Sequence, residues 1–139
     1  MCKKIGILNY GLGNLGSVFN ALKTIGCNPV IIDSKFNVNS IDFLIVPGVG
    51  SFDSGIRGLT KNGYDDLIRE FAEKEKNILG ICLGAQLLCQ NSEEGKLNGL
   101  GLFDDYFVKK FENNLPLPNM GWNWVRKQNE DYSIKSNRF

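Results

Sequence analysis

A cysteine between two glycines is the residue of this sequence best suited to chemistry. Cys82 lies in the segment at residues 80–84, after an apolar run and directly before a helix-forming stretch. The pattern G-x-C-x-G is the cysteine form of the nucleophile elbow, where a strand turns sharply into a helix and large flanking side chains would collide. A helix N-terminus favours the thiolate, and the backbone N–H of Leu83 would point at a developing oxyanion. The predicted strand, the glycines and the predicted helix together favour a nucleophile at Cys82. The alternative is a core cysteine in a glycine-rich turn, which explains fewer of these features.

The sequence contains no histidine, so it offers no imidazole base to accept the thiol proton. Glu93 and Glu94 are poor substitutes, because a carboxylate is too weak a base at neutral pH. The other three cysteines, Cys2, Cys27 and Cys89, are interpreted as small core hydrophobes. Since no two cysteines form a C-x-x-C pair and no histidine completes a zinc set, we expect no metal site.

Two glycine-rich segments could present backbone N–H groups to a ligand. Residues 11–16 fit G-x-G-x-x-G, and Asp33 follows Gly11 at 22 residues, the spacing of a ribose-binding acid in a dinucleotide fold. A tight strand-to-helix turn explains the same glycines. Residues 47–52 follow an apolar run, and glycines at the carboxyl end of a strand border the ligand crevice of an open α/β sheet. Because Cys82 also ends a strand, we expect residues 47–52 and Cys82 to face one crevice.

Strands and helices alternate along the chain that must position these residues. Short apolar runs predict strands over residues 5–10, 29–33, 42–46 and 78–81. Amphipathic patterns predict helices over residues 17–25, 65–76 and 83–90. The alternation predicts an open, mostly parallel sheet with helices on both faces. Residues 100–103 and 106–108 look like strand pieces with no helix after them, so the sheet is expected to be incomplete at the C-terminus.

Composition narrows the class of protein. The 139 residues suit one domain, and the 42% apolar share suffices for a core. The 16 basic and 15 acidic residues argue against a nucleic-acid or membrane partner, because both need a basic excess. No apolar run approaches the roughly 20 residues of a membrane helix, and no signal-peptide core follows the start. We therefore expect a cytoplasmic location.

Five segments, taken in order, resemble signature segments of the class I, or triad, glutamine amidotransferases. They lie at residues 9–18, 46–52, 79–88, 92–95 and 117–123. Residues 79–88, LGICLGAQLL, resemble the nucleophile segment of that family, and residues 46–52, VPGVGSF, are similar to its oxyanion strand. Residues 9–18 are similar to one branch, the glutaminase subunits of imidazole glycerol phosphate synthase in histidine biosynthesis. The resemblance covers residues 4–125 and implies a flavodoxin-like three-layer α/β fold.

The resemblance implies a reaction for Cys82. The thiolate would attack the side-chain amide of glutamine, ammonia would leave a glutamyl thioester, and water would release glutamate. Backbone N–H groups of the oxyanion strand and of the elbow would hold the oxyanion, and a helix side chain would bind glutamine. In this sequence the resemblance assigns oxyanion and substrate binding to Gly48, Val49, Gly50, Leu83 and Gln86. No cofactor is implied.

The resemblance also implies a partner, a (β/α)₈-barrel synthase subunit that receives the ammonia in a heterodimer. There the ammonia would react with a ribonucleotide intermediate to give imidazole glycerol phosphate and an aminoimidazole carboxamide ribotide. The residues expected to face this partner are Gly13, Asn14, Asn119, Met120, Gly121, Trp122 and Asn123.

The sequence departs from the family in ways that leave its function open. The family completes its triad with a histidine and a glutamate beyond the last residue here, so residues 1–139 are expected to be the N-terminal portion of a glutamine amidotransferase type 1 domain. Asn119 stands where the family has a histidine, and Ala85 where it has a methionine. Because of these two differences, the chain could instead be a relative that supplies ammonia to a sugar amidotransferase in surface-polysaccharide synthesis. The chain could also be a non-catalytic partner protein, or a domain that binds a dinucleotide through residues 11–16 and Asp33.

Overall fold

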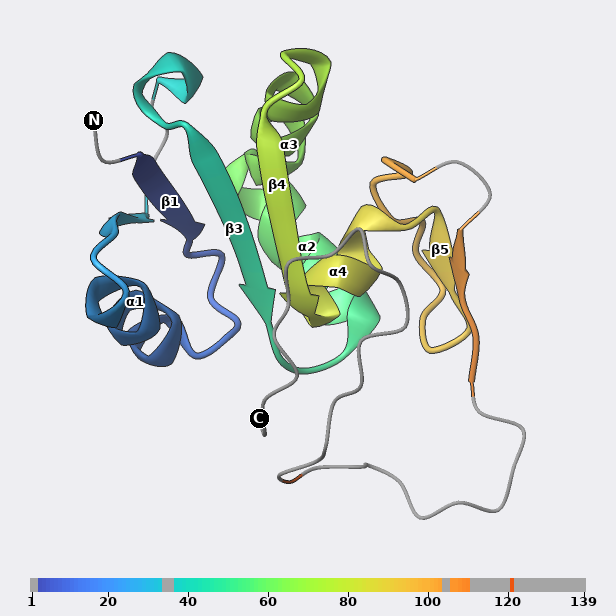
Figure 1. Cartoon of the computed structure of the whole chain (residues 1–139). Helices are drawn as coiled ribbons and strands as arrows, with labels where there is room; N and C mark the ends of the chain where they lie inside the picture. Colours follow the sequence, from blue (N-terminus) through green and yellow to red (C-terminus); the bar gives the residue numbers. More distant parts are fainter. Residues whose placement is uncertain (1–2, 34–36, 104–105, 111–120, 122–139) are drawn as a thin grey trace, which may run out of the picture.

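The computed structural model describes residues 3–33, 37–103, 106–110 and Gly121. At its centre is a four-stranded sheet in the order β2-β1-β3-β4, with every neighbouring pair parallel (Figure 1). The strands are β1 (Lys4–Leu8), β2 (Asn28–Ile32), β3 (Phe43–Gly48) and β4 (Asn77–Cys82). The predicted parallel sheet is therefore confirmed, with strand boundaries that differ by a few residues at most.

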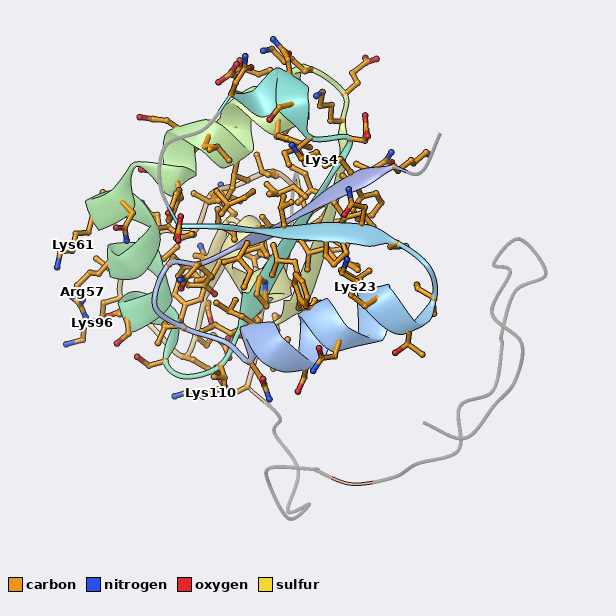
Figure 2. All side chains as sticks on the ribbon, turned by 90° about the vertical axis from the view of Figure 1, so that its left-hand side faces the viewer. Lys4, Lys23, Arg57, Lys61, Lys96 and Lys110 are labelled. Atoms are coloured by element: carbon orange, nitrogen blue, oxygen red, sulfur yellow. The ribbon has the colours of Figure 1, made fainter. Side chains whose placement is uncertain are left out.

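Helices cover both faces of the sheet, as predicted. Helix α1 (Leu15–Thr24) packs against β1 and β2 on one face. The other face is covered by α2 (Phe52–Asn62), α3 (Tyr64–Glu73) and α4 (Leu83–Leu88). The view along the sheet in Figure 2 separates α1 from α2 and α3. No helix of the described residues is long and apolar enough to cross a membrane.

The strand order places the carboxyl ends of β1 and β3 at a topological switch point. From β1 the chain moves outward to β2, and it then returns to the other side of β1 to form β3. The loops that follow two such strands run in opposite directions, and ligands of open α/β proteins bind at this position. The segments that follow β1, β3 and β4 all lie at this edge of the sheet.

Most of the core lies between the sheet and the helices of the second face. Side chains from β1, β2 and β3 alternate, so every second residue points to this core. Its members include Leu8, Ile32, Leu44 and Val46 from the sheet and Phe52, Leu59, Ile68, Phe71 and Leu87 from the helices. Burial of each such side chain contributes about 1.5–3 kcal/mol. This core fixes β3 and β4 relative to α4, which begins beside Cys82.

The other face is covered less completely. Helix α1 has no fully buried residue. On β4, Leu79 and Ile81 remain 46% and 37% exposed. Ile7 and Ile45, in the neighbouring strands on the same face, are buried. An apolar strip along β4 is therefore open to solvent on the α1 side.

Two elements differ from the sequence-based prediction. Helix α2 was not predicted, because glycines occupy positions of its buried face: a Cβ on Gly55 would lie 2.8 Å from Leu87 of α4. The strand predicted over residues 100–103 is wrong. There the backbone N–H groups of Leu100 and Leu102 donate to the carbonyls of Leu87 and Leu88 at 2.9 and 2.8 Å, so this segment closes the end of α4.

A second, two-stranded sheet lies beyond α4. It pairs β5 (Asn91–Ser92) with β6 (Phe107–Val108) in parallel. The strand piece predicted over residues 106–108 is thus confirmed, although its partner is β5 and not the main sheet.

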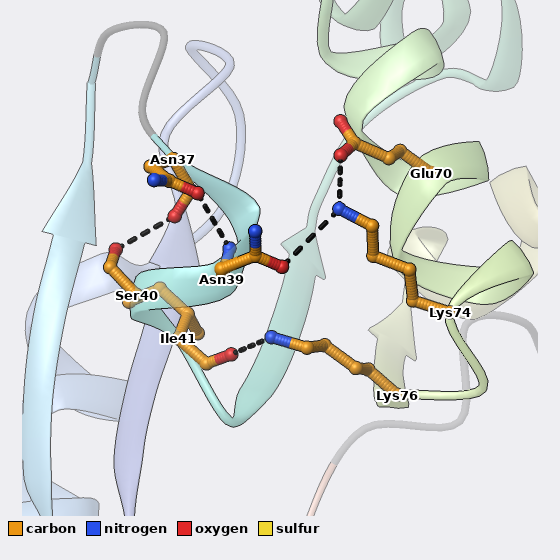
Figure 3. A network of polar contacts seen from close by, with 7 residues as sticks. All are labelled: Asn37, Asn39, Ser40, Ile41, Glu70, Lys74 and Lys76. Carbon is orange, nitrogen blue, oxygen red and sulfur yellow. Dashed lines mark hydrogen bonds and ion pairs between the residues drawn. The ribbon is translucent and has the colours of Figure 1, made fainter.

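A polar network ties the turn before β3 to the end of α3 (Figure 3). The turn contains the short 3₁₀ helix η1 (Val38–Ser40). Lys74 Nζ donates to Glu70 Oε1 at 2.6 Å and to Asn39 Oδ1 at 3.3 Å, and Lys76 Nζ donates to the Ile41 carbonyl at 2.7 Å. These contacts lie at the amino ends of β3 and β4, far from Cys82, and we assign them to stability.

Candidate active site

Cys82 has the backbone conformation of a nucleophile elbow. It is the last residue of β4, and α4 begins at the next residue. Its φ is 54° and its ψ is −117°, a region that residues with a side chain seldom occupy. Such a conformation costs about 1–3 kcal/mol and persists only where surrounding contacts impose it. The thiol is free and exposed, as a nucleophile requires.

Two of the other cysteines are less exposed than Cys82. Cys27 and Cys89 are both half-buried, so neither is the fully buried core residue that the sequence predicted. Cys2 lies outside the described residues. Exposure therefore distinguishes Cys82 from Cys27 and Cys89.

The two glycines that flank Cys82 are required by close backbone contacts. A Cβ on Gly84 would overlap the carbonyl oxygen of Val46 in β3, and a Cβ on Gly80 would overlap the backbone of Ala85 in α4. The backbone of the elbow therefore packs closely against β3 on one side, and the end of β4 packs closely against the start of α4 on the other. This confirms the steric reason for the G-x-C-x-G pattern.

The structure brings the second glycine-rich segment beside Cys82. Gly48, the last residue of β3, pairs with Cys82 across the sheet. A Cβ on Gly48 would lie 2.7 Å from the Gly84 nitrogen and 2.9 Å from the Leu83 Cβ. Beyond it, Val49 is 61% exposed and Gly50 has a φ of 117°. We refer to residues 47–50, the end of β3 and the two residues after it, as the oxyanion loop, after the role that the sequence predicts for this segment.

Two residues of α4 were predicted to take part in binding. Leu83 is its first residue, and its side chain is buried in the core. Its backbone N–H is among the four at a helix N-terminus that have no partner within the helix. The Oε1 atom of Gln86 is buried, and no described group donates to it. A buried acceptor without a donor is unusual, and a ligand amide or ammonium group would satisfy it.

The predicted partner-facing residues fall into two groups. Gly13, with a φ of 108°, lies against the oxyanion loop, because its Cβ would be 3.2 Å from the Gly48 nitrogen. Asn14 is exposed and caps α1, accepting the Ser17 N–H at 3.1 Å. Gly121 is exposed with a φ of 149°. The remaining four lie outside the described residues: Asn119, Met120, Trp122 and Asn123.

Tyr10 is a residue of this site that pattern reasoning did not single out. It lies two residues after the end of β1, and its side chain is buried. Its hydroxyl donates to the Pro47 carbonyl at 2.6 Å. Burial raises the pKa of Tyr10 to about 12, and the negative charge of a Cys82 thiolate acts in the same direction. The sequence feature that could have identified Tyr10 is its position as an aromatic residue between a buried strand and a glycine-rich turn.

Asp53 is a second such residue, at the start of α2. Its carboxylate accepts the backbone N–H groups of Lys96 and Leu97 at 2.8 and 3.1 Å, and Arg57 lies 3.8 Å away. The two hydrogen bonds hold the pKa of Asp53 below its ordinary value. Figure 2 shows Arg57 and Lys96 on this side of the molecule. Asp53 therefore ties the loop after β5 to the helix that follows the oxyanion loop.

The groups available for proton transfer are few. The chain has no histidine. Glu93 and Glu94 are exposed on the loop after β5, and Glu93 accepts the Lys110 N–H at 2.9 Å. Across the described ranges, no three His, Cys, Asp or Glu side chains gather as a metal site would require. Among the described residues, the arrangement offers an exposed thiol beside backbone N–H groups and no imidazole that could act as a base.

The family model of the CobB/CobQ-like glutamine amidotransferase domain matches residues 7–114. Among similar curated proteins is imidazole glycerol phosphate synthase subunit HisH 2 of Methanococcus maripaludis, 42% identical over 134 residues, which are 95% of this chain and 64% of that protein. The HisH subunit of Symbiobacterium thermophilum is 41% identical over 91% of this chain and 60% of its own length. That of Sulfurimonas denitrificans is 46% identical over 86% of this chain and 60% of its own length.

The chain thus spans about three fifths of the length of these relatives. Solved structures show the same fold. A crystal structure of a glutamine amidotransferase matches with a TM-score of 0.64 and 24% identity, over 79% of this chain and 59% of that one. The PurLQS structure from Thermotoga maritima matches with a TM-score of 0.52 and 24% identity, over 63% of this chain and 43% of that one.

Proposed function

Because this chain belongs to the CobB/CobQ-like glutamine amidotransferase family, we propose that it carries the nucleophile half of a glutaminase site. The observation that supports this most directly is the strained elbow at Cys82 opposite Gly48. A cysteine does not need a φ of 54° to fill a core, whereas an elbow exposes the thiol beside backbone N–H donors.

In the proposed reaction, the Cys82 thiolate adds to the side-chain amide carbon of glutamine. The carbonyl oxygen becomes an oxyanion, which backbone N–H groups of Val49, Gly50 and Leu83 stabilise. The C–N bond then breaks, the nitrogen leaves as ammonia after it gains a proton, and a glutamyl thioester remains. Water adds to the thioester and restores the thiol with release of glutamate. Gln86, with its buried unpaired Oε1, binds the substrate from the first turns of α4.

Both halves of this reaction need a group that exchanges protons near neutral pH. An imidazole fulfils this role best. Since these 139 residues include no histidine, we propose that the base comes from a residue outside this sequence. The chain is then the N-terminal portion of a type 1 glutamine amidotransferase domain and has little turnover by itself.

The names of the similar curated proteins favour one branch of the family. The proteins from Methanococcus maripaludis, Symbiobacterium thermophilum and Sulfurimonas denitrificans are all named as subunits of imidazole glycerol phosphate synthase. We propose that this chain belongs to the glutaminase subunit of that synthase, in histidine biosynthesis, and passes ammonia to a (β/α)₈-barrel subunit. Gly13, beside the oxyanion loop, and the adjacent Asn14 would face this partner. A cytoplasmic location fits the free thiols of Cys27, Cys82 and Cys89.

Three competing functions make different predictions. A relative that feeds a sugar amidotransferase would keep Cys82 and bind a different synthase, and Ala85 and Asn119 leave that branch open. A non-catalytic partner protein would bind the barrel without using Cys82. A dinucleotide-binding function is less favoured, because contact with the oxyanion loop already accounts for Gly13.

The decisive experiment treats the full chain with a chloroketone analogue of glutamine, in which CH₂Cl replaces the amide NH₂. We expect one adduct, on Cys82, whose rate saturates with reagent concentration and falls when glutamine, but not glutamate, competes. The matched control is Cys82→Ser. Labelling without saturation or competition would contradict a glutamine site. Binding measured separately to the barrel synthase and to a sugar amidotransferase then distinguishes the branches.

A further inference from the structure

Tyr10 joins the end of β1 to the end of β3, across the switch point of the sheet. Its Oη donates to the Pro47 carbonyl at 2.6 Å, between residues 37 positions apart, and both residues are buried. The same Oη would lie 2.5 Å from a Cβ on Gly48. The hydroxyl therefore reaches the strand residue that pairs with Cys82.

This hydrogen bond restricts one backbone dihedral angle, the ψ of Pro47. The ring of a proline fixes its φ near about −65°, so its ψ is the dihedral that remains soft. The ψ of Pro47 sets the direction of its carbonyl. Because the peptide unit is planar, holding the Pro47 oxygen also fixes the direction of the Gly48 N–H and the start of the oxyanion loop.

Neighbouring contacts hold Tyr10 itself in place. A Cβ on Gly58 of α2 would lie 2.8 Å from the Tyr10 carbonyl oxygen and 3.2 Å from its ring. Gly13, in the turn after Tyr10, lies against the same Pro47–Gly48 peptide. With its pKa raised to about 12, the phenol stays protonated and remains a donor throughout the neutral range.

We propose that Tyr10 is a positioning residue that fixes the Pro47–Gly48 peptide and thereby orients the oxyanion loop beside Cys82. The inference rests on the proposed glutaminase function. Tyr10 acts through the backbone of the loop and does not touch the substrate.

The test compares two reagents on Tyr10→Phe. The chloroketone analogue of glutamine develops an oxyanion as the thiolate adds, whereas iodoacetamide reports only how available the thiolate is. We expect Tyr10→Phe to slow the chloroketone reaction at Cys82 about fivefold, the equivalent of one hydrogen bond, and to leave the iodoacetamide rate unchanged. The control is Tyr64→Phe, another buried tyrosine whose hydroxyl lies 3.5 Å from a carbonyl oxygen. It should change neither rate.

The outcomes separate the two proposals. If wild-type Cys82 shows no preference for the chloroketone relative to a free thiol such as glutathione, the proposed function fails. If that preference exists and is the same in Tyr10→Phe, only the role of Tyr10 fails. A loss of both rates together would mean a general structural effect and would also overturn the positioning role.

A second variant covers the case in which Tyr10→Phe does not fold. Gly58→Ala keeps the hydroxyl but must displace Tyr10, because its Cβ would contact the Tyr10 carbonyl and ring. We expect the same selective loss of the chloroketone rate. Gly16→Ala is the control, because a Cβ there meets no atom closer than 3.9 Å. An unchanged chloroketone preference in Gly58→Ala would overturn the proposal.

Discussion

Gly48 and Cys82 are paired across β3 and β4, each as the last residue of its strand. The register of this pair therefore decides which loop residues lie beside the thiol. A slip by one residue would turn every side chain of β4 to the other face of the sheet. It would also place Pro47 or Val49 opposite Cys82, so changes that disturb this register should affect the site before they unfold the chain.

We expect Cys82 to react faster than the free thiols of Cys27 and Cys89. Cys82 is exposed, whereas the other two are half-buried. Burial raises the pKa of Cys89, so a smaller fraction of it is thiolate at neutral pH. Iodoacetamide labelling followed by peptide mass spectrometry measures each rate near neutral pH. Faster reaction at Cys89 near neutral pH would contradict the assignment.

Gly84→Ala should destabilise the chain by about 1–3 kcal/mol, the typical cost of overpacking, and should impair labelling of Cys82. Its added Cβ would overlap the Val46 carbonyl oxygen, so the elbow must move away from β3. In Gly16→Ala, in contrast, the Cβ meets no atom closer than 3.9 Å near the start of α1, where alanine gains about 0.5–1 kcal/mol of helix propensity. Urea unfolding of both variants tests the contrast. Equal stabilities would mean that the elbow is not tightly packed.

Much of the fold could be predicted from local patterns. The apolar runs that became β1 to β4 are short and bounded by glycine or charge, and the elbow pattern combines strand, turn and helix within a few residues. Helix α2 could not be predicted in this way, because Gly55 and Gly58 weaken its apolar periodicity. These two glycines are required by tertiary packing, because Leu87 and Tyr10 occupy the space that larger side chains would need.

The candidate site shows the same division. Cys82 and its flanking glycines could be recognised from their spacing, because the steric requirement for small residues beside the cysteine is local. The roles of Tyr10 and Asp53 depend on partners 37 and 43 or more residues away. The pattern of apolar and polar residues along the chain does not indicate such a long-range contact. The residues of the site that sequence reasoning missed are thus the ones whose contacts form only when distant segments fold together.

Asp53→Asn should lower the melting temperature at neutral pH and have less effect in acid. The backbone N–H groups of Leu97 and Lys96 lower the pKa of the folded carboxyl. A group whose pKa is depressed in the folded state adds stability above its unfolded value, about 3.9, and loses it as the pH falls through the folded value. Melting curves near neutral pH and near pH 3 should show the gap to wild type closing. Glu73→Gln, on an exposed residue of α3, is the control.

The isolated 139-residue chain should hydrolyse glutamine far more slowly than a longer relative. General acid–base catalysis is typically worth about 10² to 10⁴ in rate, and the chain has no histidine to provide it. Ammonia release is the measurement, with the Methanococcus maripaludis relative as reference. Turnover comparable to that of the reference would show that another group fulfils the role of the base.

The two faces of the sheet should respond differently to the loss of a leucine. Leu44 of β3 is fully buried against the helices of the second face, so Leu44→Ala should destabilise the chain by about 2–5 kcal/mol. Leu79 of β4 is 46% exposed on the α1 side. Leu79→Thr introduces a β-branched side chain suited to a strand, and should cost less than about 1 kcal/mol while it shortens an exposed apolar strip that favours association. Urea unfolding gives the two stabilities, and light scattering at raised concentration gives the association. A Leu79→Thr variant as unstable as Leu44→Ala would mean that the α1 face of β4 is covered in solution.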